Sequence, residues 1–157
     1  MSTIKVDTLQ TRAGSTAAVT GAGFVATDQI RGNTSAGSTT VVAEGGTNTT
    51  NLQQGLAKSW VNCDGTGTVS VRDSFNHSSL TDNATGDYTI TIAAAMSNTN
   101  YCRSGMAGQA HNSQEVISQC EDTTPATTTV ARYINAYANA SLEDPEYLGV
   151  VLHGDLA

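Results

Sequence analysis

The stretch Asp87-Tyr88-Thr89-Ile90-Thr91-Ile92 decides the fold class, because large apolar side chains and threonines alternate along it after the first residue. Successive side chains of a β-strand point to opposite faces, so Tyr88, Ile90 and Ile92 share one face and the threonines share the other. The pattern predicts an antiparallel strand with one face in the core and the other in water.

Similar runs rich in Val, Ile, Thr and Tyr recur in the rest of the chain at roughly the 8–12-residue spacing of a sandwich. They predict seven strands, at Lys58–Cys63, Thr68–Phe75, Asp87–Ile92, Asn100–Met106, Glu115–Cys120, Thr127–Tyr137 and Tyr147–His153. Between them, Asp64-Gly65-Thr66-Gly67 predicts a tight hairpin. Asp82–Asp87 predicts a second turn, before Tyr88–Ile92. We therefore expect an all-β domain over residues 58–157, an antiparallel β-sandwich of jelly-roll-like type.

Residues 1–57 have a different composition. Of these 57 residues, 32 are Thr, Gly, Ala or Ser, and Phe24 is the one aromatic residue. Such a segment buries too little apolar surface to offset the conformational entropy lost on ordering. We expect residues 1–57 to be an extended segment for attachment and oligomerisation, ordered by other copies or by a larger assembly.

A homotrimer is the expected oligomer, because a threefold arrangement lets the few apolar residues of this segment meet their symmetry copies. The candidate contacts in the segment are Phe24, Val41 and Val42. The strand predicted at Tyr147–His153 is more continuously apolar than the others, so the second sheet or a neighbouring subunit is expected to cover both of its faces. Val150 and Leu152 are therefore further candidates for subunit contact.

Charge and hydropathy exclude several classes of partner. The seven Lys and Arg residues are scattered and the net charge is -7, so no basic cluster is available to neutralise a phosphate backbone. The chain contains no run of about 18 apolar residues, which is the length that predicts a membrane span. Its first residues do not resemble a signal peptide. We expect neither nucleic-acid binding nor membrane insertion.

The motifs give no pattern typical of catalysis or metal binding. Cys63, Cys102 and Cys120 lack zinc-ligand spacing, although Cys102 and Cys120 could pair if their strands are neighbours. The three histidines stand in separate segments without a nucleophile motif. The acidic loop Asp82–Asp87 lacks the bidentate Glu and the ligand spacing of a calcium loop. We expect a protein without enzyme activity, metal or cofactor.

Three aromatic residues are open to more than one interpretation. Trp60 can anchor a core or form a platform that stacks on sugar, and its position beside Val61 in a strand favours the core. Tyr133 and Tyr137 lie four residues apart and hence on one strand face. They could form an exposed receptor contact, a part of the core or a subunit contact.

Several stretches resemble a domain common in virion appendage proteins of tailed bacteriophages, especially aquatic ones. They are Lys58–Val69, Arg72–Asn76, Thr81–Ile90, Ala95–Tyr101 and Tyr147–Val151. Ser2–Gln10 is similar to the short N-terminal start of the same proteins. The chain departs from the family at Cys63, where an aromatic residue is usual, and the connector Gly14–Gln54 matches no family pattern.

The resemblance implies a small structural protein of the virion, made in the cytoplasm of the bacterial host. Its N-terminal segment would dock on capsid or tail proteins through Ile4, Val6 and Leu9, which alternate with polar residues as a short strand. Its sandwich would face outward as a tail fibre, head fibre or capsid decoration and contribute to host adsorption. The alternative is a carbohydrate-binding or depolymerising module that recognises a host surface glycan.

Overall fold

The structure is a computed structural model that describes residue 30 and residues 39–108, 116–120 and 125–157. The chain divides into two units, Met1–Arg31 and Gly32–Ala157, and all the strands and the helix described below belong to the second. The predicted docking and contact residues Ile4, Val6, Leu9 and Phe24 lie outside the described residues.

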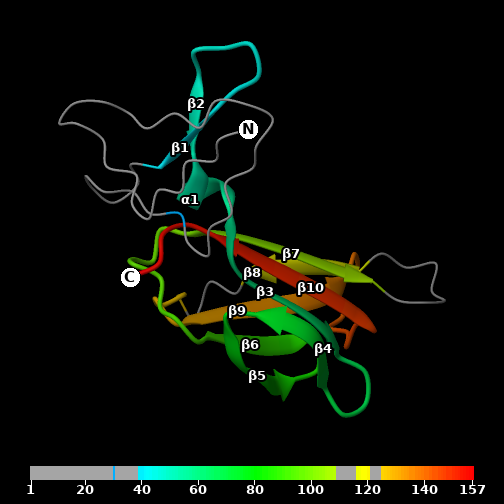
Figure 1. Ribbon diagram of the computed structural model, residues 1–157. Coiled ribbons are helices and arrows are strands. Elements are labelled where there is room, and N and C mark those ends of the chain that lie inside the picture. The colour runs from blue at the N-terminus through cyan, green and yellow to red at the C-terminus, as the bar shows by residue number, and fades with distance from the viewer. Residues whose placement is uncertain (1–29, 31–38, 109–115, 121–124) are drawn as a thin grey trace, which may run out of the picture. The chain divides into compact units, whose positions relative to one another are not determined.

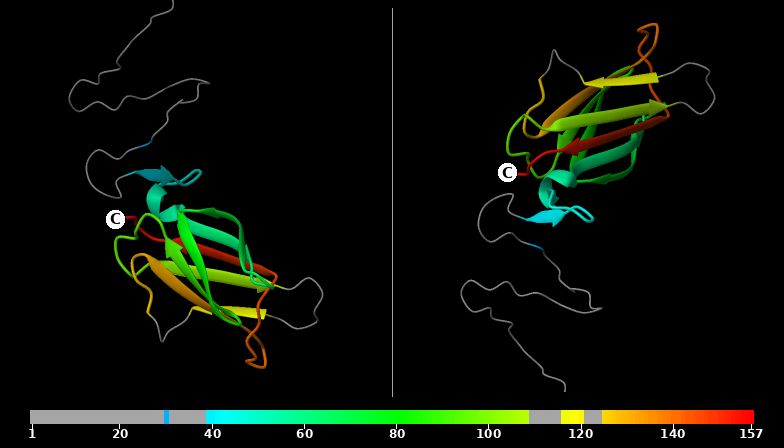
Figure 2. Two further views of the ribbon diagram at one scale, coloured as in Figure 1. Left: turned by 90° about the horizontal axis from the view of Figure 1, so that it is seen from below. Right: turned by 90° about the horizontal axis from the view of Figure 1, so that it is seen from above.

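Two four-stranded antiparallel sheets pack face to face (Figure 1, Figure 2). The first sheet has the order β4-β3-β10-β7 and the second sheet the order β5-β6-β9-β8. The strands are β3 (Ala57–Asp64), β4 (Ser70–Phe75), β5 (His77–Ala84), β6 (Asp87–Ile92), β7 (Cys102–Gly108), β8 (Val116–Cys120), β9 (Val130–Tyr137) and β10 (Tyr147–His153). The all-β antiparallel architecture is confirmed, whereas the jelly-roll-like winding and the trimer stay predictions.

Three hairpins, β3–β4, β5–β6 and β8–β9, each stay within one sheet. The chain crosses to the other sheet after β4, β6, β7 and β9. Strand β10, the last of the sandwich, pairs with β3, the first. The sandwich is therefore closed by its own terminal strands at the centre of the first sheet.

All seven predicted strands are present, with ends shifted by at most three residues. Strand β5 was not predicted, because Leu80 is its one large apolar residue and the rest of His77–Ala84 is small or polar. The two predicted turns are confirmed, since Gly67 and Gly86 adopt positive φ values of 61° and 71°. The second turn is shorter than predicted and occupies Thr85 and Gly86 alone.

A hairpin of β1 (Thr40–Val42) and β2 (Thr49–Asn51) precedes the sandwich and leads into the one-turn helix α1 (Leu52–Gly55). Asn51 caps α1, because its Oδ1 accepts a hydrogen bond from the backbone nitrogen of Gln54 at 3.0 Å. Val41 and Val42, two predicted oligomer contacts, are 52% and 60% exposed. Their side chains are accessible, and their contact with other copies stays a prediction.

The core lies between the two sheets. Its largest fully buried side chains include Tyr88, Tyr133, Ile90, Met96, Leu148, Leu152, Val61 and Val150. The prediction that Tyr88, Ile90 and Ile92 share the core face is confirmed. Val150 and Leu152 are core residues and not subunit contacts, because alternation along β10 turns both of them inward.

A network of polar side chains joins the strands on the solvent side of the second sheet. Arg132 on β9 donates hydrogen bonds to Asp87 on β6, from Nε at 2.7 Å and from Nη2. Asn83 donates from Nδ2 to Asp87 at 3.1 Å and to Thr89 Oγ1 at 2.8 Å. The hydrogen bond from Arg132 is the main reason that the pKa of Asp87 lies below its ordinary value.

Candidate binding face

Trp60 lies on the solvent side of the first sheet. Alternation along β3 turns Ser59, Val61 and Cys63 into the core, and Trp60 points the opposite way and is partly exposed. The prediction that Trp60 anchors the core is therefore wrong. The fully buried aromatic residues of the core are Tyr88 and Tyr133 instead.

The strand register arranges the solvent side of the first sheet in three rows, and we call this side the outer face. The aromatic row runs across the sheet as Phe75, Trp60, Val151 and Ser104. The polar row runs beside it as Asp73, Asn62, Gly149 and Met106. The third row contains Tyr147 and Gly108, which pair between β10 and β7.

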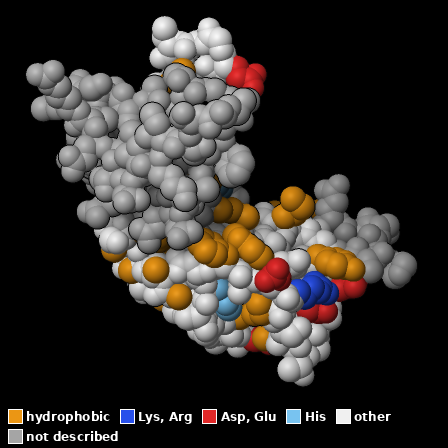
Figure 3. Space-filling model, in the orientation of Figure 1, with side chains coloured by type: hydrophobic (Ala, Val, Ile, Leu, Met, Phe, Trp, Pro, Cys, Tyr) orange, Lys and Arg blue, Asp and Glu red, His pale blue; other side chains and the backbone are white. Residues whose placement is uncertain are grey.

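Exposure separates this face from an ordinary solvated sheet. Phe75 is 52% exposed, Tyr147 is 49% exposed and Met106 is 78% exposed. The space-filling view shows hydrophobic side chains at the surface near a group of basic and acidic side chains (Figure 3). Large apolar side chains exposed together on one face are typical of a binding surface.

A bulge in β4 places Arg72 over Tyr147. The register shifts between Asn62 and Cys63, so Arg72 has no partner on β3 and its side chain reaches across the sheet. Its guanidinium carbon stands 4.7 Å from the centre of the Tyr147 ring. A hydrogen bond to Glu146 is the main reason that the pKa of Tyr147 is raised.

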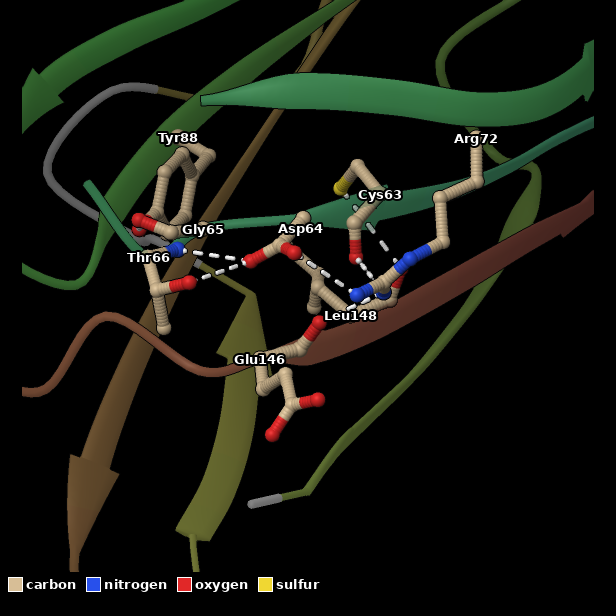
Figure 4. Close-up of polar contacts among 8 residues, drawn as sticks. All are labelled: Cys63, Asp64, Gly65, Thr66, Arg72, Tyr88, Glu146 and Leu148. Carbon is tan, nitrogen blue, oxygen red and sulfur yellow. Dashed lines mark hydrogen bonds and ion pairs between the residues drawn. The ribbon is translucent and has the colours of Figure 1, made fainter. Parts of the chain in front are cut away.

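The polar groups of Arg72 are bound to the protein on three sides (Figure 4). Nη1 donates to the carbonyl oxygens of Cys63 at 3.0 Å and Glu146 at 2.5 Å, and Nη2 donates to Asp64 Oδ2 at 2.8 Å. Asp64 also accepts hydrogen bonds from Thr66 Oγ1 and N, which are the main reason that its pKa is lowered. Arg72 is therefore a cation held in place by three acceptors of the protein.

The hairpin between β3 and β4 is hydrogen-bonded to the rest of the domain beside this cluster. Gly65 N donates to Pro145 O at 2.9 Å, and Tyr88 Oη donates to Asp144 Oδ1 at 2.6 Å, with Gly65 O at 3.2 Å as a second, longer acceptor. A Cβ at Gly65 would stand 2.4 Å from Tyr88 Oη, so glycine is required for this close approach. This end of the outer face is therefore tied to the segment that precedes β10.

Helix α1 directly precedes β3, at the end of the outer face away from Arg72. Lys58 is buried there, with Nζ donating to Leu56 O at 2.8 Å and to Gln53 O. A pocket of about 670 Å³ lies beside it, lined mainly by Leu56, Phe75, Leu156, Lys58, Gln54 and Asp155. Phe75 thus belongs both to this pocket and to the aromatic row.

The two tyrosines predicted as a possible receptor contact lie in β9. Tyr133 is fully buried, and alternation turns it toward the first sheet, so it is a core residue and not a receptor contact. Burial is the main reason that its pKa is raised. Tyr137, at the end of the strand, is partly exposed.

The groups considered for catalysis and metal binding have structural partners or stand apart. Asp87 is bound by Arg132, and Asp144 Oδ1 accepts hydrogen bonds from Tyr88 Oη and Gly86 N, both at 2.6 Å. Cys63, Cys102 and Cys120 are free thiols, and burial raises the pKa of Cys63 to about 11. Within the described ranges, no three or more His, Cys, Asp and Glu side chains are grouped to hold a metal ion.

The sequence carried a signal for this face that the prediction did not use. In Ser59-Trp60-Val61-Asn62-Cys63, alternate residues lie on the same face of the strand. Trp60 therefore lies on the face of the polar Asn62, and Val61 lies on the face of Cys63. Alternation alone therefore favours an outward Trp60. The prediction rested instead on the position of Trp60 beside the apolar Val61.

Comparisons with protein-family models, with curated proteins and with solved structures find no match. The described part of the chain holds no helix with the length and apolar character that crossing a membrane requires.

Proposed function

We propose that the chain is a structural protein of a bacteriophage particle, docked through its N-terminal segment and carrying the sandwich outward as a fibre or capsid decoration. One observation carries the proposal. Among the described residues, the core cluster extends from Val61 to Leu152 and includes no residue that precedes the sandwich. A domain with a core of its own leaves the preceding segment available for attachment to another protein.

The resemblance of the chain to virion appendage proteins supports the same assignment. In this proposal Ile4, Val6 and Leu9 add a short strand to an edge of a capsid or tail protein. The protein is made in the host cytoplasm and ends in the virion.

Docking can be tested in the phage that encodes the chain. The triple substitution Ile4→Ser, Val6→Ser and Leu9→Ser should remove the protein from purified particles, measured by mass spectrometry. The matched control changes the polar neighbours Lys5, Asp7 and Thr8 to Ser and should leave incorporation unchanged. Normal incorporation of the first variant would reject docking through this segment.

The proposed assembly is a homotrimer, since Val41 and Val42 are exposed just before the sandwich and could be buried around a threefold axis together with Phe24. Light scattering of the purified full chain measures the mass in solution. A monomer at micromolar concentration would reject the trimer.

A module that recognises a host glycan is the second candidate, and the outward position of Trp60 favours it. An indole beside Phe75 on an open sheet can stack on a sugar ring. In the depolymerising version of this candidate, incubation with host polysaccharide would shorten the polymer, which size-exclusion chromatography detects. Binding without shortening would leave the recognition role alone.

A further inference from the structure

We propose that the outer face binds a short, uncharged oligosaccharide, with stacking groups at both ends and the polar row between them. This inference rests on the second candidate function, glycan recognition, and it names the site and the class of ligand. The aromatic row supplies Trp60 and Phe75 at one end, and Tyr147 stands at the other.

The spacing of the stacking groups fits more than one sugar unit. Tyr147 and Val151, the partner of Trp60, are four residues apart on β10, which corresponds to about 13 Å along a strand. A single ring cannot touch both ends, whereas a linear oligosaccharide can. The aromatic faces would stack on the apolar faces of the sugar rings.

The polar row lies between the two ends, and we call the open position at Gly149 in this row the floor of the site. A Cβ at Gly149 would find no atom within 4 Å, so the space above this residue is open. Asn62 and Asp73, both exposed, flank it on one side and Met106 flanks it on the other. An amide and a carboxylate can donate to and accept from vicinal hydroxyls, which an aliphatic partner would leave unused.

The site is preorganised at its third row. Arg72 packs against the Tyr147 ring and is itself held by three hydrogen-bond acceptors. A ring that is already fixed loses little conformational entropy when a ligand binds.

Charge selects an uncharged ligand over an acidic one. Asp73, Asp64 and Glu146 lie in or beside the rows, and the net charge of the chain is -7. Of the described basic residues on this face, Arg72 and Lys58 both turn their donors to protein oxygens. A uronate, sialate or phosphate group would meet carboxylates, and the cations nearest to it are already hydrogen-bonded within the protein.

The same arrangement argues against a protein partner. Asn62 separates Trp60 and Phe75 from Tyr147 on the β3 side of the sheet, and Met106 is the one large apolar side chain of the polar row. Stable protein interfaces have a desolvated apolar centre with charged groups at the rim. Here the polar Asn62 lies on a central strand between the stacking groups, and Asp73 lies beside it on the edge strand β4.

The single tryptophan of the chain makes the test direct, because fluorescence of the full-length protein reports on Trp60 alone. Tetrasaccharides of glucose, galactose, mannose and N-acetylglucosamine should be titrated in turn, together with a uronic acid tetrasaccharide. We expect at least one neutral tetrasaccharide to shift the emission and saturate, with at least tenfold weaker binding of the acidic one. Absence of any response, or tighter binding of the acidic probe, would overturn the proposal.

Gly149→Val is the decisive variant, because it fills the open floor without a predicted clash. Calorimetric titration with the bound tetrasaccharide should show at least a tenfold loss of affinity, while the melting temperature stays close to that of the wild type. The matched control is Thr81→Val, which adds the same side chain at an exposed position of the second sheet. Retained affinity in Gly149→Val would overturn the site.

Particle incorporation separates this inference from the structural proposal. Gly149→Val should enter particles normally, because the N-terminal segment is intact. If Gly149→Val loses sugar binding but enters particles normally, the result supports both the structural role and the oligosaccharide site. If the wild type enters particles but binds no sugar, the oligosaccharide site is rejected and the structural role is not.

Discussion

The two sheets share one core but present different outer faces. On the second sheet, Arg132, Asp87 and Asn83 bind one another through hydrogen bonds, and Thr89 joins them. On the first sheet, Trp60, Phe75 and Tyr147 are at least partly exposed, and the polar residues between them stand in the open. A sheet face needs only polar side chains to remain in water, so the aromatic face requires another explanation.

The comparison shows that the core forms without Trp60, the largest apolar residue of the chain. Tyr88 and Tyr133, from the second sheet, fill the interior, and the first sheet contributes medium-sized side chains such as Val61, Leu148 and Leu152. Trp60 is thereby left for the surface. Stability and binding should respond to different residues, and the following substitutions separate them.

The largest effect is expected in the shared core. Tyr133→Ala removes a fully buried ring and should lower the free energy of unfolding by about 3–5 kcal/mol. Chemical denaturation measures the loss. A change below about 1 kcal/mol, the range of surface substitutions, would mean that Tyr133 is exposed, as the receptor-contact prediction required.

The next effect concerns the polar face of the second sheet. Asp87→Asn weakens the pair with Arg132 and should cost about 2–3 kcal/mol of unfolding free energy at pH 7. The pKa of Asp87 is lower in the folded chain than in the unfolded chain. Its contribution is therefore complete above the ordinary carboxyl pKa of about 3.9 and is lost as the pH falls through the lowered value.

Denaturation of both proteins at several pH values checks this sign. The difference in stability between wild type and Asp87→Asn should shrink as the pH falls below about 4. Asp82→Asn, at an exposed position of β5, is the control and should change stability by less than about 0.5 kcal/mol. A gap that widens in acid would contradict the assignment of the pair.

A matched pair of tyrosines gives a smaller effect within the core. Tyr88 Oη donates to Asp144 and Gly65, so Tyr88→Phe should cost about 1–2 kcal/mol. Tyr133 Oη is buried without a hydrogen-bond partner among the described residues, so Tyr133→Phe should be neutral or slightly stabilising. Equal losses in the two variants would refute the difference in their hydroxyl contacts.

Local alternation was sufficient to predict much of the fold. In Asp87–Ile92 the large residues and the threonines alternate without interruption, so both the strand and its core face were predicted. In β5, Leu80 is the one large apolar residue, so no alternation of apolar and polar side chains can be recognised. The strand was therefore not predicted. Its place is set by pairing with β6 and not by its own pattern.

The candidate site was less predictable, because it depends on pairing between distant segments. Trp60 meets Phe75 across one strand pair and Val151 across another, and no local pattern fixes either register. Gly149 becomes a floor only because Asn62 and Met106 flank it. The sequence contains the residues of the site, and the sheet brings them together.

A modest effect on stability and a large effect on binding are expected for Trp60→Ala. If Trp60 anchored the core, the substitution would cost about 3–5 kcal/mol. Because its side chain lies on the solvent side of the sheet but is only partly exposed, we expect a loss below that range, about 1–2 kcal/mol.

Melting and sugar binding should be measured on the same Trp60→Ala protein, with calorimetry replacing fluorescence because the reporter is lost. Phe75→Leu is the companion variant, since it keeps an apolar side chain in the aromatic row and removes the ring. Both should melt within a few degrees of the wild type and bind the neutral tetrasaccharide at least tenfold more weakly. A large drop in the melting temperature of Trp60→Ala would return the indole to the core. It would also remove the distinction between the two outer faces, because the first sheet would then use its aromatic residues for folding.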